Sequence, residues 1–258
     1  LGFYFYYYES DVMELYGYKV YHSLIKSQNK TNNVKTLILG DSAARQAYDN
    51  YTYNNDTYSL ASNQAISMAG QYLLLRNFLE VYDTPKELTV ILIYRPSSFA
   101  NDLDQKYTYQ YFLKPFYNKK NIPYLTDYSF SKISKVPFNN LVNLNFIKNS
   151  NWSPPYYMGN NDFLKFDISK TSEEYLVKMK ELCDSYQVKS FYLKCSFLSN
   201  NISESDINLF QTRIDELNLT EIFQGYFKEI PFFDKDLFSD GIHLRKDVIP
   251  YDFLELTN

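Results

Sequence analysis

The chain has 258 residues, of which 45% are hydrophobic and 22% charged, a balance that excludes an intrinsically disordered protein and allows a real buried core. It contains no run of the roughly 20 apolar residues that span a bilayer, so we expect no transmembrane helix in it. A formal net charge of −4 without a long basic run gives no electrostatic footprint for nucleic acid, and two Cys and two His are too few for a closed Cys/His zinc site, which leaves only a carboxylate-rich metal site open.

The first eight residues, LGFYFYYY, are too short for a signal-peptide core and lack a basic flank. Two interpretations stay open: the edge of a deleted N-terminal membrane anchor, or a buried lead-in segment. Residues 10–28 then have the apolar spacing of an amphipathic helix, with Asp11 as cap and Glu14 as its reciprocal partner. His22 lies in the middle of this helix beside Tyr and Leu residues, and we interpret it as structural.

A short apolar run at residues 34–39, VKTLIL, ends at Gly40 and is typical of a buried parallel strand entering a turn. A helix or tight turn follows at 42–48, and a second strand is expected at 58–61. Residues 68–82 predict a long helix with an apolar face, and LTVILIY at 88–94 predicts a strand buried on both faces.

From residue 95 to about 170 the periodicity fades, and we expect an insertion of short helices that forms a lid or substrate wall. A helix at 171–186, capped by Thr171 or Ser172, a strand at 188–197, a helix at 203–217 and a last strand at 222–230 complete the order. Cys183 and Cys195 are expected to be buried thiols, with a disulfide between them as the alternative.

This alternation predicts one α/β domain over residues 1–258, built on a mostly parallel five-stranded sheet with helices on both faces. Chemistry in such sheets collects at the carboxyl ends of the strands. We therefore expect residues 40–42, 61–64 and 95–102 to share one edge.

Ser42 follows the first strand directly and is preceded by Gly40 and Asp41, which displays its hydroxyl at that edge. His243 is one of only two His in the chain. Asp240 stands three residues before it, where its carboxylate can accept the Nδ1–H of the imidazole and leave Nε2 free to act as a base. The simpler interpretations are that Asp41 or Ser42 only caps the next helix and that Asp240-Gly241 is only a turn.

Taken together, Gly40-Asp41-Ser42 after the first strand and Asp240-Gly241-Ile242-His243 late in the chain resemble the SGNH (GDSL-like) hydrolase superfamily. The likeness covers residues 34–94 and 188–244. It implies a flavodoxin-like three-layer α/β/α sandwich, no cofactor, Ser42 as nucleophile, His243 as general base and Asp240 as the residue that orients it.

The family also places a Gly after its second strand to help form the oxyanion hole, and here residues 59–65 contain none. A backbone N–H of Gln64 or Ala65 is the expected substitute, beside that of Ser42. The family's Gly-x-Asn-Asp is represented by Asn101-Asp102 without the Gly, which makes Asn101 a candidate side-chain donor and Asn63 a weaker one.

Residues 36–102 are also similar to extracytoplasmic, membrane-anchored members of that superfamily, which act with other assembly proteins on envelope polymers such as alginate-type polysaccharides and teichoic acids. This similarity implies a serine esterase or O-acyltransferase that acts on an acylated glycan in the bacterial cell envelope. Arg45 and Arg95 are candidates for binding an anionic substrate group, and the aromatic residues of the insertion could stack on sugars or simply pack its core. The alternatives are a catalytically decayed glycan- or partner-binding module and a nucleotide binder, which lacks any Gly-rich phosphate loop.

Overall fold

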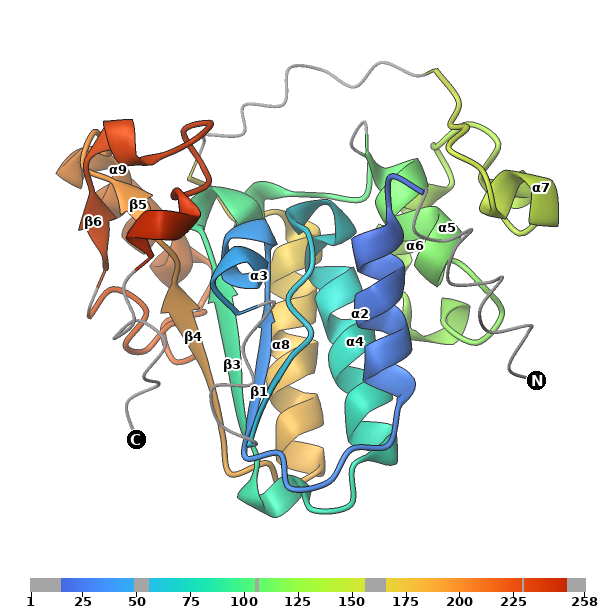
Figure 1. Cartoon of the computed structure of the whole chain (residues 1–258), viewed down its shortest axis with the longest axis horizontal. Coiled ribbons are helices and arrows are strands. Elements are labelled where there is room, and N and C mark those ends of the chain that lie inside the picture. Colours follow the sequence, from blue (N-terminus) through green and yellow to red (C-terminus); the bar gives the residue numbers. More distant parts are fainter. Residues whose placement is uncertain (1–14, 49–55, 105–106, 156–165, 229, 250–258) are drawn as a thin grey trace.

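The computed structural model describes residues 15–48, 56–104, 107–155, 166–228 and 230–249. Its centre is a four-stranded parallel sheet of order β2-β1-β3-β4 (Figure 1). The strands are β1 Thr36–Gly40, β2 Thr57–Ser59, β3 Thr89–Tyr94 and β4 Ser190–Cys195. The expected α/β class and parallel sheet are therefore confirmed, whereas this sheet has four strands within the described ranges and not five.

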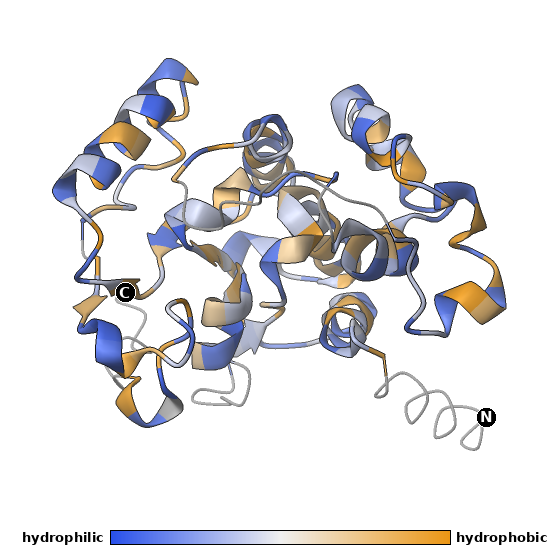
Figure 2. Ribbon diagram, turned by 90° about the horizontal axis from the view of Figure 1, so that it is seen from above, coloured by the Kyte–Doolittle hydropathy of each residue, from blue (hydrophilic) through white to orange (hydrophobic). Residues whose placement is uncertain are grey.

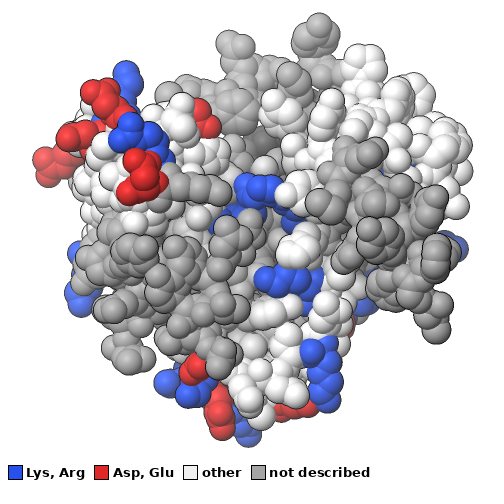
Figure 3. All heavy atoms as spheres, viewed as in Figure 1, with Lys and Arg blue, Asp and Glu red and all other residues white. Residues whose placement is uncertain are grey.

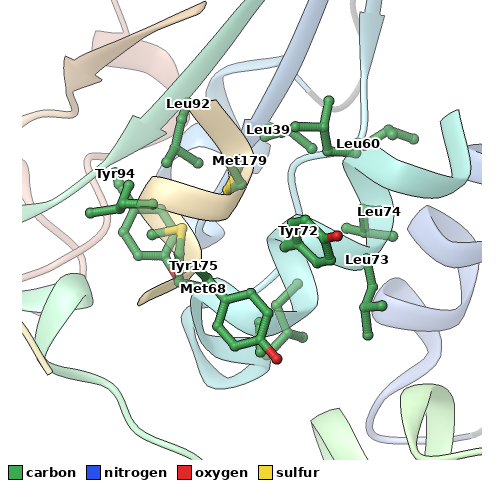
Figure 4. Packing of buried hydrophobic residues seen from close by; sticks show 14 of the residues in the cluster. Leu39, Leu60, Met68, Tyr72, Leu73, Leu74, Leu92, Tyr94, Tyr175 and Met179 are labelled. Carbon is green, nitrogen blue, oxygen red and sulfur yellow. The ribbon is translucent and has the colours of Figure 1, made fainter. Parts of the chain in front are cut away.

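Strands β1 and β3 lie at the centre of the sheet and are buried along almost their whole length. Their side chains alternate between two apolar layers, as the pleat requires. Leu37, Leu39 and Leu92 face the larger layer, which α2, α4 and α8 complete. Figure 4 shows Leu39 and Leu92 in the same layer as Met179 of α8 and Leu74 of α4.

The other face of the sheet is covered by much less. Ile38, Ile91 and Ile93 point to it and pack against α3 and against Phe238 and Leu244 of the C-terminal segment. A short helix and a loop therefore cover the face where the prediction placed helices alone.

The main helices are close to their expected positions, except that the first was expected from residue 10 and begins at Tyr18, after a turn at residues 15–17. They are α2 Tyr18–Gln28, α3 Ser42–Tyr48, α4 Ser67–Val81, α8 Lys170–Ser185 and α9 Glu204–Glu216. The expected cap Asp11 lies outside the described residues. The cap of α8 is Ser169, whose Oγ accepts the N–H of Ser172, and is neither Thr171 nor Ser172.

The expected strand at 222–230 is wrong, because residues 220–228 form turns and the next strand comes later. Phe223 and Tyr226 lie one turn apart and bury their rings against Phe99 and Phe210. The fifth and sixth strands, β5 Leu198–Ser199 and β6 Phe232–Phe233, pair in parallel as a separate small sheet that continues beyond β4.

The described part of the insertion, residues 95–104, 107–155 and 166–170, contains short helical segments, as expected. They include η3 Pro96–Ala100, the π-helical η4 Tyr109–Leu113, α5 Lys114–Phe116, α6 Asp127–Ile133, η6 Asn139–Leu141 and α7 Asn145–Lys148. Asp102 ties its base to the rest of the domain by accepting the hydroxyls of Tyr128 at 2.8 Å and Thr171 at 2.5 Å. Asp102 therefore has a structural position.

Cys183 and Cys195 are free, buried thiols, and burial raises the pKa of each to about 12. The disulfide alternative is therefore not adopted. Within the described ranges, every helix is too short or too polar to cross a bilayer.

Candidate active site

The turn after β1 positions Ser42 through the small size of Gly40. A Cβ on Gly40 would lie 2.4 Å from both the Ala44 Cβ and the Ile93 carbonyl oxygen, so only glycine lets α3 start this close to β3. The side-chain amide of Gln71 fixes the same residue by donating to its carbonyl at 2.8 Å and accepting its N–H at 3.3 Å. Ser42 is consequently the first residue of α3, at the carboxyl end of the sheet.

Asp41 is almost completely buried and joins three parts of the chain. Its Oδ1 accepts the N–H groups of Ala43 and Ala44 at 3.0 and 3.3 Å, which caps α3. Its Oδ2 accepts the N–H of Arg95 at 3.1 Å and the hydroxyl of Ser98 at 2.7 Å. The capping interpretation is thus confirmed for Asp41, while the same contacts hold the Ser42 turn against the end of β3.

The residues around His243 form a hairpin on the second face of the sheet. Phe238 and Leu244 pair as an antiparallel bridge and bury their side chains beside β1, β3 and α3. Gly241 has a φ of +76°, the left-handed region that favours glycine, and lets the loop reverse. The N–H of Ser239 donates to the His243 carbonyl at 2.8 Å and closes the hairpin.

This hairpin places the imidazole over Ser42. His243 Nε2 lies 2.8 Å from Ser42 Oγ, across 201 residues of chain, and His243 Nδ1 lies 2.6 Å from Asp240 Oδ2. Asp240 Oδ1 also accepts the N–H groups of Ile242 and His243. Partial burial acts to raise the pKa of Asp240, but these hydrogen bonds from His243 and Ile242 outweigh it, so the pKa is lowered and the carboxyl stays ionised.

Arg95 has a different position from the one expected of a substrate-binding residue. Its side chain is 2% exposed, and its Nη1 donates to the Ile242 carbonyl at 2.8 Å, inside the loop that holds His243. Burial lowers the pKa of Arg95, and the nearby carboxylates of Asp41 and Asp240 act in the opposite direction. This position does not favour the prediction that Arg95 contacts substrate, because the residue is buried and its Nη1 is bonded to the backbone of the His243 loop.

The expected oxyanion donors separate into two groups. Ser42 and Gln64 are the first residues of α3 and of η1 (Gln64–Ile66), so their N–H groups have no acceptor within those helices. The N–H of Ala65, in contrast, already donates to Asn63 Oδ1 at 2.8 Å. This hydrogen bond occupies the backbone donor of Ala65 and the side-chain oxygen of Asn63. Asn101 is buried, and its Nδ2 donates to the Ser98 carbonyl at 3.0 Å.

Two residues that the sequence did not single out support this arrangement. Ser98 Oγ lies 3.0 Å from Gln64 Oε1 as well as 2.7 Å from Asp41. The single hydroxyl proton of Ser98 cannot donate to both Asp41 and Gln64. The network is satisfied when the side-chain amide of Gln64 is flipped, so that its nitrogen donates to Ser98 Oγ while Ser98 donates to Asp41. Gln71 is the other residue, and neither could be found from spacing because each acts across distant segments.

Arg45 lies one helical turn beyond Ser42, and its Nε donates to the Ser62 carbonyl at 3.1 Å. His22 is on the exposed side of α2. Among the described residues, no group of three or more His, Cys, Asp or Glu is arranged to hold a metal ion. In comparisons with known proteins, no family model, no curated protein and no solved structure matches this chain.

Proposed function

We propose that this protein is a serine-dependent esterase or O-acyltransferase of the SGNH type that acts on an acylated polysaccharide of the bacterial cell envelope. The observation that carries the proposal is the chain of contacts from Ser42 Oγ through His243 to Asp240, at 2.8 and 2.6 Å. Both distances lie within the hydrogen-bond range of a nucleophile, its base and the group that orients the base. The five-stranded, flavodoxin-like sheet of that superfamily is part of the same proposal, although among the described residues β5 and β6 pair only with each other and do not join the four-stranded sheet.

In the proposed reaction, Ser42 Oγ attacks the ester carbonyl while His243 Nε2 takes its proton. The N–H groups of Ser42 and Gln64 stabilise the oxyanion that forms, and Asn101 is a third donor if its amide leaves the Ser98 carbonyl. The protonated imidazole then gives its proton to the departing alcohol, which leaves an acyl group on Ser42. Water or a sugar hydroxyl, deprotonated in turn by His243, releases that acyl group as acid or as a new ester.

Hydrolysis and transfer use the same catalytic groups and differ in the acceptor. Arg45, one turn from Ser42, remains our candidate for contact with an anionic group on the glycan. An acylated glycan is the proposed substrate, and we propose that the protein is extracytoplasmic and attached to the membrane.

The second candidate is a binding module that keeps the fold without the reaction. Its support is the absence of a glycine at residues 59–65 together with the internal hydrogen bond of Asn101, which leaves only backbone donors for the oxyanion. The loss of one oxyanion donor typically costs about 10²–10³ in rate.

A fluorophosphonate probe separates these candidates, because it reacts only with an activated serine. We expect the wild-type protein to be labelled at Ser42 and to hydrolyse p-nitrophenyl acetate, and the Ser42→Ala variant to do neither. Ser129→Ala is the matched control, since it removes a buried hydroxyl on α6 that has no contact with the Ser42 site. Equal labelling of wild type and Ser42→Ala would exclude Ser42 as nucleophile, and no labelling of either would favour the binding module.

A further inference from the structure

One corner of the insertion combines exposed apolar side chains with positive charge. From residue 105 to residue 155 the sequence contains seven Lys and a single acidic residue, Asp127, although the whole chain has a net charge of −4. Within this stretch the α7 surface is defined by a set of exposed or half-exposed side chains on η6, α7 and the segments beside them. Its members are Lys135, Phe138, Leu144, Phe146, Lys148 and Trp152.

The apolar members of this surface project outward and are not unfilled parts of the core. Phe146 is 72% exposed and Phe138 53%, whereas Val142 and Ile147 of the same segment are buried. The core-facing positions are therefore already filled. Figure 1 places α7 at the outer edge of the molecule, and hydrophobic residues colour the ribbon at the same edge in Figure 2.

The backbone holds two of these aromatic rings in place. Phe138 has a φ of +58°, a left-handed conformation that a bulky residue rarely adopts. Its ring packs edge to face against the ring of Trp152, with 6.1 Å between the ring centroids. The ring of Trp152 in turn packs against the buried Tyr109, with 5.8 Å between the centroids. The exposed rings of Phe138 and Trp152 are therefore held in place by contact with a buried residue.

Charge complementarity indicates what this surface meets. Lys132 is neutralised by Asp104, with its Nζ 2.7 Å from the carboxylate, but no ion pair with a described residue holds Lys135 or Lys148. No acidic side chain is visible at this corner on the face that Figure 3 shows. Protruding Phe, Leu and Trp side chains flanked by Lys fit the interface of a bilayer, where apolar groups enter the headgroup region and lysines attract anionic lipids.

We propose that the α7 surface docks the protein on the surface of a membrane that contains anionic lipid. Stacking on a sugar uses aromatic faces alone, whereas this surface also exposes Leu144 and carries lysines beside its apolar side chains, which favours a lipid surface. The docking does not depend on the reaction at Ser42, so each proposal can fail without the other.

Trp152 is the only tryptophan of the chain, so its emission reports on this surface alone. The protein is mixed with phosphatidylcholine vesicles that either contain or lack phosphatidylglycerol, and bound protein is measured by co-sedimentation. We expect binding to the anionic vesicles, much weaker binding to the neutral ones, and a blue shift of the Trp152 emission on binding.

Variants test whether the named residues are responsible. Phe146→Ser should weaken binding by about tenfold or more, because it removes a buried aromatic group from the bound state. Lys148→Gln should weaken it by roughly fivefold and reduce the dependence on phosphatidylglycerol. Leu209→Ser is the matched control, since Leu209 is 65% exposed on α9, outside the α7 surface, and should leave binding unchanged.

All three side chains are exposed or half-exposed, so the variants should fold, which their thermal unfolding would verify. Failure of the wild type to bind anionic vesicles would overturn the proposal. It would also be overturned if Phe146→Ser and Leu209→Ser bound equally well. A Trp152 shift with alginate oligosaccharides and none with vesicles would assign the surface to glycan binding instead.

Discussion

Asp240 determines which nitrogen of His243 carries the proton. Its carboxylate accepts from Nδ1 at 2.6 Å, which leaves Nε2 as the acceptor facing Ser42. Because the side chain is half exposed, its value to the site lies in this orientation and not in a large contribution to stability.

Asp240→Asn should therefore remove reactivity and keep the fold. An amide placed at Nδ1 favours the wrong imidazole tautomer, and the rate of p-nitrophenyl acetate hydrolysis should fall by about 10³–10⁴. Asp236→Asn, an exposed Asp on the same segment, serves as the control. A rate for Asp240→Asn within a few-fold of the wild-type rate would contradict the role of the carboxylate.

The carboxyl of Asp240 also makes the stability of the hairpin depend on pH. Its pKa is lowered below 3.8 in the folded protein, so its stabilising contribution is present above that pH and is lost as the pH falls through the lowered value. The difference in unfolding free energy between wild type and Asp240→Asn should accordingly disappear in strong acid.

Arg95 is a positioning residue in the proposed site, since it acts on His243 only through the Ile242 carbonyl. Arg95→Met should slow fluorophosphonate labelling of Ser42 by roughly 10- to 100-fold, the effect of losing one charged hydrogen bond. Arg95→Lys, which keeps the charge, should recover part of that loss.

The two His of the chain give this prediction an independent readout. In a ¹⁵N spectrum of labelled histidine, the ring signals of His243 should move in Arg95→Met, and those of the exposed His22 on α2 should not. Unchanged His243 signals together with slower labelling would mean that Arg95 acts in some other way.

At the scale of elements, two glycines serve two different structures. Gly40 allows α3 to pack against β3, and Gly241 allows the hairpin to turn. The first belongs to the core of the domain and the second to an exposed loop.

Alanine at these two positions should consequently have different effects. Gly40→Ala should reduce the unfolding free energy by about 1–3 kcal/mol, because its Cβ meets backbone and a neighbouring helix. Gly241→Ala should cost about 1–2 kcal/mol of strain within the hairpin, and should lower Ser42 labelling more than global stability. Urea unfolding and probe labelling of both variants would check this, and identical profiles would contradict it.

Elements with a strong local pattern were predictable from the sequence. The runs VKTLIL and LTVILIY are strands because their apolar side chains fill layers on both sides of the sheet. Ser42 could be proposed from the Gly-Asp-Ser motif after the first strand, and Asp240 and His243 could be proposed from the Asp-x-x-His motif late in the chain. The structure adds their distances, while their chemistry remains a prediction.

Features that depend on distant contacts were not predictable. Residues 222–230 have the composition of a strand, but Phe223 and Tyr226 are drawn into the aromatic cluster with Phe99 and Phe210, and the backbone turns to allow it. The contact of Arg95 with Ile242 spans 147 residues and leaves no periodic signal. An arginine at the end of a strand is equally compatible with solvent, substrate or a buried carbonyl.

At the scale of the whole molecule, Ser42 and His243 belong to opposite ends of the described chain. Ser42 is held by the first strand of the sheet, and His243 reaches it only after 201 further residues. During synthesis on the ribosome, Ser42 therefore leaves the exit tunnel long before the imidazole of His243 can reach it. In the proposed enzyme, the growing polypeptide would not react with esters until the hairpin between Phe238 and Leu244 had emerged and packed against the sheet.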